Sequence, residues 1–443
     1  MKLYGLLAVA LLSLTNVLQA GGDPFKGYSN TVSYFLKYAE GTSFGPNGTS
    51  DVRIEITIAG RTHVFDVDTG SRGLYVSVEE LGPDFQIDPD LSYPGEIDLS
   101  SSGRVSSGMW TPVTASLDVK DLAGNPKTVS TSFNILAVTT LGAQSGRTAT
   151  FGVKDDADVT SVNLIGGGTV PVETDTDGKK FISLTNNGSA NQQVTFADNP
   201  GVFNPVSNCG IGFDLSGESG GTGPVEDNKN QIYNPLINLE EMKDGTLVAG
   251  YIIRTDGIQL GFTAADKGYG YTRLNSTELT SDNSVPDWQT PTGRVVVRRI
   301  TKLPGSVVMD SGIPNAFVSA PGLIVGTLIT GPMSVYLMNS KGAVGYNINL
   351  KDASNELNPE KVLVVKAGTN GTYSQGKRPY QGQFFNTGRH VFRKFNMLYD
   401  AENGYMGVLP NAAGKSDTNI FFKPRPGGFP NPYARTKPPR TSS

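Results

Sequence analysis

The sequence predicts an all-β protein built from two related halves, and three observations lead to this prediction. Glycine and proline are abundant, at 54 and 27 of 443 residues, and only 18% of the residues are charged, which is typical of short strands joined by many turns. Apolar residues alternate with polar ones, as at Val52, Ile54, Ile56 and Ile58, which favours half-buried strands. The third observation is a short motif that occurs twice.

The repeated motif places an aspartate between two apolar runs. "VFDVDTGSRGLYV" contains Asp68, and "GSVVMDSGIPNAFV" contains Asp310; in both, a small hydroxyl residue and a glycine follow the aspartate. One copy alone is compatible with an ordinary turn. A buried, unpaired carboxylate is costly, so two copies in matching contexts favour two carboxyl groups that share a proton. Such a pair suits general acid–base chemistry on a water molecule.

The beginning of the chain predicts secretion. Residues 1–20 contain Lys2, an apolar stretch and a small Ala20, which indicates a signal peptide with cleavage after Ala20. We therefore expect an extracellular or periplasmic protein. The alternative, an N-terminal membrane anchor, is weaker because the apolar run is short, and no later run approaches the ~20 residues of a membrane helix. Cys209 is the only cysteine, so no intrachain disulfide forms, and we expect a buried small hydrophobe there.

Composition shifts divide the rest of the chain. Residues 21–47 read as a short, irregular lead-in, and 48–232 as the first half, with an insertion of loops and short strands at about 144–204. Residues 233–412 form the second half, which opens with a helix in "NPLINLEEMKDG". Residues 413–443 are Pro-rich and basic, so we expect a disordered tail that contributes nothing to folding.

Charge and composition disfavour several classes of function. The formal net charge is −4 and the pI is about 5.4, so nothing indicates nucleic-acid binding. The two histidines, His63 and His390, lie far apart without a Cys/His cluster, which disfavours a Ser–His triad or a zinc site. We expect no metal, no cofactor, no membrane partner and a monomer.

At this point the chain resembles the pepsin-like aspartic peptidases. "FDVDTGSRGLYV" and "VVMDSGIPNAFV" resemble the family's two active-site stretches, and "CGIGF" is weakly similar to the strand behind the first. "NPLINLEEMKDGTLVAGYIIRTDGIQLGF" resembles the passage between the lobes, and "NTGRHVFRKFNMLYDAENGYMGVLP" the closing segment. The motifs occur in the family's order over about residues 51–410, and the absence of disulfides marks a divergent member.

The resemblance implies a bilobal pepsin-like acid protease fold, with two β-lobes, a pseudo-two-fold axis and a central cleft. It implies a secreted aspartic endopeptidase that acts on a protein or peptide substrate. Asp68 and Asp310 would activate a water between them, without a covalent intermediate, metal or cofactor. The residues that would support this dyad are Thr69, Gly70, Ser71, Ser311 and Gly312. Thr69 and Ser311 would bind the opposite loop's backbone, the glycines would let the backbone approach the carboxylates, and Ser71 would bind the outer oxygen of Asp68.

The sequence departs from the family's pattern at three places near the expected site. Ile313 stands where a Thr or another small residue is usual, which predicts that Asp310 loses a hydrogen-bond donor. The branched apolar side chain should also raise the pKa of Asp310 by desolvation. The expected flap, "GEIDLSSSGRVSSGMWTPVTASL", has no tyrosine near its tip, and we expect Trp110 to pack in the core of the first half instead. Asn386 reads as a replacement for a family glycine.

Two other functions remain open from the sequence, because function depends on the site rather than on the fold. The flap and Ile313 favour a non-catalytic member that uses its cleft as a binding module for peptide or glycan. A third possibility is a structural surface protein that displays loops such as 144–204. The segment of residues 21–47 is a further departure from the family. It is too short, and too poor in Lys and Arg, for the family's basic inhibitory prosegment, so we expect secretion without a typical zymogen stage.

Overall fold

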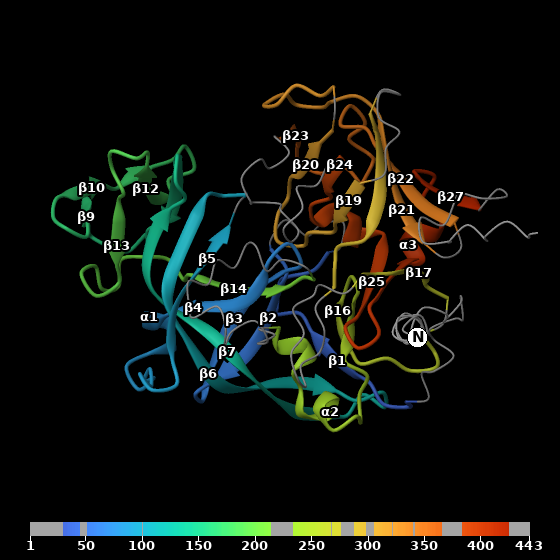
Figure 1. The fold of residues 1–443 in the computed structure, drawn as a ribbon, viewed down its shortest axis with the longest axis horizontal. Helices are drawn as coiled ribbons and strands as arrows, with labels where there is room; N and C mark the ends of the chain where they lie inside the picture. Colours follow the sequence, from blue (N-terminus) through green and yellow to red (C-terminus); the bar gives the residue numbers. More distant parts are fainter. Residues whose placement is uncertain are drawn as a thin grey trace, which may run out of the picture.

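The computed structural model describes residues 30–44, 51–99, 101–213, 234–266, 268–275, 288–297, 305–320, 322–339, 342–365 and 383–424. The fold is mostly β, with two large sheets and a few short helices (Figure 1). The predicted signal peptide and the last part of the predicted tail lie outside the described residues. No helix in the described part of the chain is long and apolar enough to cross a bilayer.

Six strands of the larger sheet form a closed ring, which we call the first half. The ring follows the order β7-β4-β14-β3-β2-β6, and the pairing of β6 with β7 closes it. These strands are β2 (Arg53–Ile58), β3 (Arg61–Asp68), β4 (Arg72–Ser77), β6 (Arg104–Lys120), β7 (Pro126–Ala143) and β14 (Ser207–Ile211). In β2 the alternating isoleucines point inward and are fully buried, as the sequence pattern predicts.

The main sheet of the second half has eight strands, in the order β23-β20-β24-β19-β18-β21-β22-β27. Its strands are β18 (Thr292–Val297), β19 (Gly305–Val308), β20 (Ala316–Ser319), β21 (Met333–Asn339), β22 (Gly342–Ile348), β23 (Val362–Val364), β24 (Gln383–Asn386) and β27 (Ile420–Pro424).

The two halves repeat one strand arrangement. In the first half, β14 lies between β3 and β4, parallel to β3 and antiparallel to β4. In the second half, β24 lies between β19 and β20 with the same directions. On its other edge, β4 pairs in parallel with β7, and β20 likewise pairs in parallel with β23. The same local arrangement of four strands therefore occurs in both large sheets, around β3 and around β19.

Further strands of the large sheet continue from the first half across the middle of the molecule. They are β1 (Tyr34–Lys37), β16 (Gly257–Leu260), β15 (Gly250–Ile253), β25 (Phe395–Asp400), β26 (Tyr405–Pro410) and β17 (Gly270–Arg273). β1 pairs with β6 and β16 and buries Tyr34 and Leu36. The predicted irregular lead-in is therefore wrong for this stretch, because its alternating apolar residues fill a place in the sheet.

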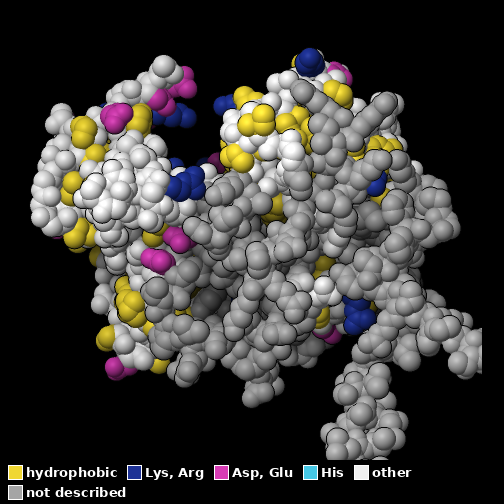
Figure 2. Space-filling model, turned by 45° about the horizontal axis from the view of Figure 1, so that its top comes forward, with side chains coloured by type: hydrophobic (Ala, Val, Ile, Leu, Met, Phe, Trp, Pro, Cys, Tyr) yellow, Lys and Arg dark blue, Asp and Glu magenta, His cyan; other side chains and the backbone are white. Residues whose placement is uncertain are grey.

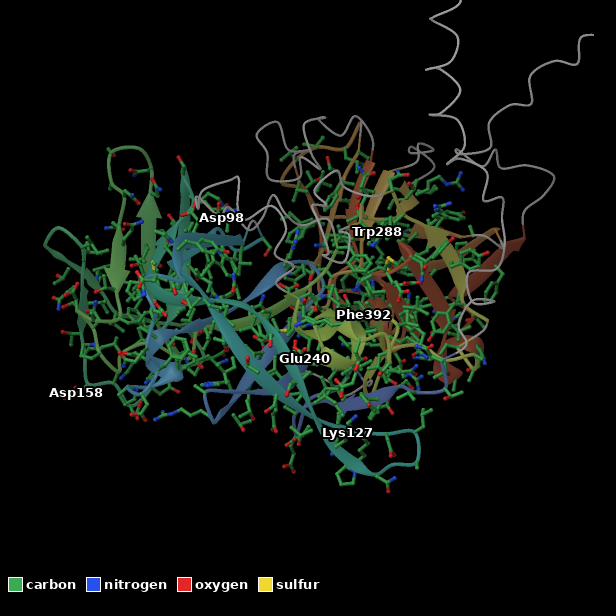
Figure 3. All side chains as sticks on the ribbon, turned by 60° about the horizontal axis from the view of Figure 1, so that its bottom comes forward. Asp98, Lys127, Asp158, Glu240, Trp288 and Phe392 are labelled. Atoms are coloured by element: carbon green, nitrogen blue, oxygen red, sulfur yellow. The ribbon has the colours of Figure 1, made fainter. Side chains whose placement is uncertain are left out.

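One hydrophobic core extends through both halves. It includes strands of the ring, of the crossing sheet and of the second half. Phe392, which lies in the interior (Figure 3), follows Arg389 in the helical turn η3 (Arg389–Arg393) and stacks on Phe44 at a centroid distance of 4.9 Å. The N-terminal segment and the end of the second half thus pack together in the centre.

The insertion contributes a second core at the outer end of the first half. Its strands are β8 (Arg147–Gly152), β9 (Ser161–Asn163), β10 (Thr169–Pro171), β11 (Glu173–Thr174), β12 (Lys180–Asn186) and β13 (Gln193–Thr195). They pack beside β5 (Tyr93–Leu99), which forms a hairpin with the start of β6. Trp110 lies in this core and is only 1% exposed, which confirms its predicted place. Asp98 of the hairpin lies on the side toward the second half, and Asp158 lies at the outer edge (Figure 3).

The predicted helix at the start of the second region is split into two pieces. η2 (Pro235–Ile237) is capped by the Asn234 side chain, which accepts a hydrogen bond from the backbone N–H of Leu236 at 2.9 Å. α2 (Glu240–Lys243) begins only after Leu239, whose backbone bridges to Thr131. Burial of Leu239 beside β7 interrupts the helical pattern. The other short helices are α1 (Val78–Leu81) and α3 (Ala412–Lys415).

The first part of the predicted disordered tail is ordered, so that prediction is wrong for residues 413–424. β27 pairs with β22 at the edge of the second half. The Lys394 ammonium, 8% exposed, lies between the carboxylates of Glu356 and Asp417, the latter at 3.5 Å. Asp417 belongs to this segment, so the segment helps to neutralise a buried charge.

Candidate active site

The two repeated loops meet between the halves and bring Asp68 and Asp310 together. A Cβ atom placed on Gly70 would lie 2.2 Å from Cγ of Asp310, and one on Gly312 would lie 2.5 Å from Cγ of Asp68. Each carboxyl group therefore rests against the glycine of the opposite loop. No larger residue fits at either position unless the aspartates move, which explains the glycine in both copies of the motif.

Crossed hydrogen bonds join the two loops. The backbone N–H of Thr69 donates to Oγ of Ser311 at 3.0 Å, and the N–H of Ser311 donates to Oγ1 of Thr69 at 2.9 Å. The Ser311 hydroxyl donates to the carbonyl of Val67 at 2.7 Å, and the Thr69 hydroxyl donates to the carbonyl of Met309. Both hydroxyl groups are buried, so these bonds fix the relative position of the carboxyl groups.

Asp68 accepts three hydrogen bonds. Oδ1 accepts from the N–H of Gly70 at 2.7 Å, and Oδ2 accepts from the hydroxyl of Ser71 at 2.6 Å. The side-chain amide of Asn208 donates to Oδ2 at 3.3 Å and to Oγ of Ser71 at 2.9 Å. Asp68 is half-buried. Asp68 thus has two side-chain donors and one backbone donor.

Asp310 lies in a more apolar setting and accepts two hydrogen bonds. The N–H of Gly312 donates to Oδ1 at 2.9 Å, and the amide of Asn386 donates to Oδ2 at 2.6 Å. The residue is 5% exposed. Burial raises the pKa of Asp310 well above its usual range, and the charge of Asp68 and a hydrogen bond shared with Asp68 act in the same direction. The two hydrogen bonds from Asn386 and Gly312 oppose this shift of the pKa.

Asn208 and Asn386 are site residues that the sequence analysis missed. In the strand register Asn208 lies opposite Tyr75, and Asn386 lies opposite Phe317. Tyr75 and Phe317 follow their aspartates at the same spacing, so the two asparagines occupy the same place in the two halves. The available signal was a second repeat, Asn-Cys-Gly and Asn-Thr-Gly.

The interpretation of Asn386 as a substituted glycine is therefore wrong. Gly388 occupies the place that Gly210 has in the first half. A Cβ atom on Gly388 would lie 2.4 Å from the carbonyl oxygen of Asn315, and one on Gly210 would lie 2.6 Å from the backbone nitrogen of Arg72. Both glycines thus let their strand approach the backbone that follows the aspartate.

Ile313 occupies the place that Ser71 has in the first loop. The sequence analysis predicts that Asp310 loses a hydrogen-bond donor there. The structure shows a donor to the same carboxyl group from another strand, the amide of Asn386. The pKa of Asp310 is raised in the predicted direction, with burial as the first cause, as expected from desolvation, and the charge of the neighbouring carboxylate as the second.

Aromatic rings lie beneath the loops. Tyr399 stacks on Tyr251 with centroids 5.0 Å apart, and Phe213 meets Tyr399 edge-on at 5.4 Å. Burial raises the pKa of the Tyr399 phenol, and a hydrogen bond with Thr69 partly opposes that rise. Tyr399 thus connects a buried aromatic cluster to Thr69 of the first loop.

Figure 2 shows the described surface hollowed between the first half, at the left, and the second half, at the right, with apolar side chains gathered on the right-hand rim. The hairpin of β5 and β6 belongs to the first half and carries no tyrosine in its described residues beyond Tyr93.

Other reactive residues do not form a competing site in the described part of the chain. Cys209 is buried beside β3, and burial raises the pKa of its thiol, so it is not an activated nucleophile. His63 and His390 are each buried in a different half. No group of three His, Cys, Asp or Glu side chains among the described residues has the arrangement of a metal site.

The described site thus consists of two carboxyl groups with unequal surroundings, held by two copies of one loop arrangement. This arrangement can hold one proton between the groups and keep one of them ionised. No protein-family model matches the chain, and no curated protein matches its sequence, so the geometry of the two loops carries the functional argument.

Proposed function

We propose that the protein is a secreted aspartic endopeptidase of the bilobal pepsin-like type. The observation that carries this proposal is the meeting of Asp68 and Asp310 on two equivalent loops, with Thr69 and Ser311 cross-bonded beneath them. A turn that only closes a hairpin needs no partner loop. The duplicated arrangement around two carboxyl groups supports a catalytic pair.

In the proposed reaction Asp68 is the base and Asp310 is the acid. The more hydrogen-bonded Asp68 is ionised and takes a proton from a water molecule held between the two groups. The oxygen of that water forms a bond to the carbonyl carbon of the peptide, while the proton of Asp310 passes to the carbonyl oxygen.

The resulting tetrahedral diol then collapses. The proton held by Asp68 passes to the amide nitrogen, the C–N bond breaks, and a hydroxyl proton of the diol returns to Asp310. The products are a carboxylic acid and an amine, and the pair regains its single shared proton. The two ionisations belong to the pair and bound the active pH range on both sides.

The test is proteolysis of casein or haemoglobin across about pH 3 to 7, with and without pepstatin. We expect an acid-shifted bell that pepstatin abolishes. Asp68→Asn and Asp310→Asn should each remove activity. Asp66→Asn is the matched control, because Asp66 lies on the same strand but pairs with Arg53 at 2.8 Å. Cleavage that survives in both dyad variants, or none at any pH in the wild type, contradicts the proposal.

Two observations favour the alternative function of a non-catalytic binding module for peptide or glycan. Ile313 removes the hydroxyl donor beside Asp310, and the described part of the hairpin offers no tyrosine near its tip. Binding of a peptide or glycan to the wild type, with no turnover and no loss on Asp68→Asn, would support this second function.

A further inference from the structure

The two asparagine amides lie at the outer oxygens of both carboxyl groups, and their orientation is fixed. Oδ1 of Asn386 accepts a hydrogen bond from the N–H of Gly388 at 2.9 Å, so Nδ2 is turned toward Asp310. In the first half, Nδ2 of Asn208 faces both Ser71 and Asp68. Asn386 is 5% exposed and Asn208 is 6% exposed, so water does not compete strongly for either amide.

The chemistry of an amide suits this place. It donates a hydrogen bond to a carboxylate but neither titrates nor carries a charge. A lysine or arginine there would hold Asp310 ionised and remove the acid from the pair. With no donor, a carboxyl group so deeply buried would resist ionisation further, and the second ionisation of the pair would move to higher pH.

The two halves use their amides differently. In the first half Asn208 supplements the hydroxyl of Ser71, so Asp68 has two side-chain donors. In the second half Ile313 offers no donor, and the described side-chain donor to Asp310 is Asn386. An asparagine is thus the second side-chain donor to Asp68 and the described side-chain donor to Asp310.

We propose that Asn386 is a positioning residue that replaces the hydroxyl group absent at Ile313, and that it sets the alkaline limit of the reaction through Asp310. Asn208 is its counterpart in the first half and acts on the acid limit through Asp68 and Ser71. This inference rests on the proposed function and extends it, because it assigns the control of each limb of the pH profile to one amide.

The test compares kcat/KM against pH for Asn386→Leu and Asn208→Leu on one peptide. Loss of the Asn386 donor destabilises the doubly ionised pair, so the alkaline limb should move up by about one pH unit, a tenfold change in the ionisation constant. Loss of the Asn208 donor destabilises the singly ionised pair, so the acid limb should move up instead. Asn386→Ser is a second variant, which keeps an acceptor for Gly388 but is too short to reach Asp310.

A matched control separates this role from a purely structural one. Asn355 is equally buried in the second half, and among the described residues its side chain bonds to two backbone groups, the carbonyl of Asn347 and the N–H of Leu357. Asn355→Leu should lower stability without moving either limb. In the Asn386→Leu background, Ile313→Thr should bring the alkaline limb back down, because a hydroxyl group then supplies the missing donor.

A readout without turnover keeps failure of this inference distinct from failure of the proposed function. Carbon-13 NMR of labelled aspartate carboxyl groups, assigned with Asp310→Asn, reports the titration of the pair in an inactive protein as well. A rise of about one unit in the upper apparent pKa of Asn386→Leu supports the inference. An unchanged upper pKa, or equal shifts in Asn386→Leu and Asn355→Leu, overturns it even if the wild type cleaves peptides.

Discussion

The buried histidine His390 should make the folded protein lose stability in acid. His390 is 2% exposed, and its ring meets that of Tyr346 edge-on with centroids 5.8 Å apart. Neither ring nitrogen has a hydrogen-bond partner among the residues that the structure describes. Burial lowers the pKa of His390 from 6.5 to about 3, and the charge of Arg393 contributes to the shift. At a pH between these two pKa values, His390 is protonated in the unfolded chain but neutral in the folded protein. The free energy of unfolding therefore falls as the pH falls.

The magnitude follows from the difference between the two pKa values. At about pH 4.5, roughly two units below the unfolded pKa, the penalty is about 2–3 kcal/mol, and it stops growing below pH ~3. Above pH ~7 both states are neutral and the penalty vanishes. His390→Phe removes the titrating group, and His390→Gln is a second replacement that cannot titrate in this range.

The assay is urea unfolding at about pH 7 and 4.5 for the wild type and both variants. The quantity compared is the loss of stability between the two pH values within each protein, so a constant packing cost cancels. We expect this loss to be smaller in both variants by about 2–3 kcal/mol. The matched control is His63→Gln, because burial lowers the pKa of His63 less. Equal acid sensitivity in wild type and variants would refute the reasoning.

Three further predictions concern the tail and the loops. Truncation after Ala412 removes β27 and one of the two carboxylates beside the buried Lys394 ammonium, so it should lower the free energy of unfolding in urea by about 2–4 kcal/mol. Truncation after Pro424 should leave the Tm of the full chain unchanged. Equal Tm values for the two truncated proteins would contradict this prediction. Ile313→Thr alone should move the alkaline limb of kcat/KM by less than about 0.3 unit, because the amide from β24 already donates to the same carboxyl group. Thr69→Val leaves the carbonyl of Met309 and the N–H of Ser311 without this partner, so it should lower the free energy of unfolding by about 2–5 kcal/mol. A change below about 0.5 kcal/mol would show that other contacts hold the loops together.

The sequence was most informative where a local pattern and its repeat agreed. The alternating isoleucines of β2 predict a strand with one buried face, and the two Asp-hydroxyl-Gly stretches predict two equivalent loops. In both cases the physical requirement is local: side chains alternate along a strand, and a tight loop needs a glycine at a close contact. The convergence of the two loops was expected from the repeat and from the resemblance, which implies that both aspartates meet on one axis.

The rest depended on partners far away in the chain. Asn386 lies on a strand whose register against Asp310 cannot be read from the sequence, so a polar residue in an apolar strand was taken for a lost glycine. β1 and β27 have only four and five residues, and their partners, β16 and β22, lie far away in the chain, so the sequence does not show their places in the sheets. The helix before β15 was split because burial of Leu239 against β7 outweighed the helical spacing.

His390 and Asp310 together set the range in which the proposed peptidase can work. The raised pKa of Asp310 keeps this carboxyl group protonated to higher pH than an ordinary aspartate, which extends the alkaline side of the proposed reaction. The lowered pKa of His390 weakens the fold on the acid side. Under the proposed function, activity should therefore be sustained in mild acid and should decay on incubation at about pH 3, where the histidine penalty is near its maximum. His390→Phe should slow that decay without moving either limb of the initial-rate profile, because it changes unfolding and not the ionisation of the pair. Movement of a limb in this variant would instead mean that His390 acts on the carboxyl groups themselves.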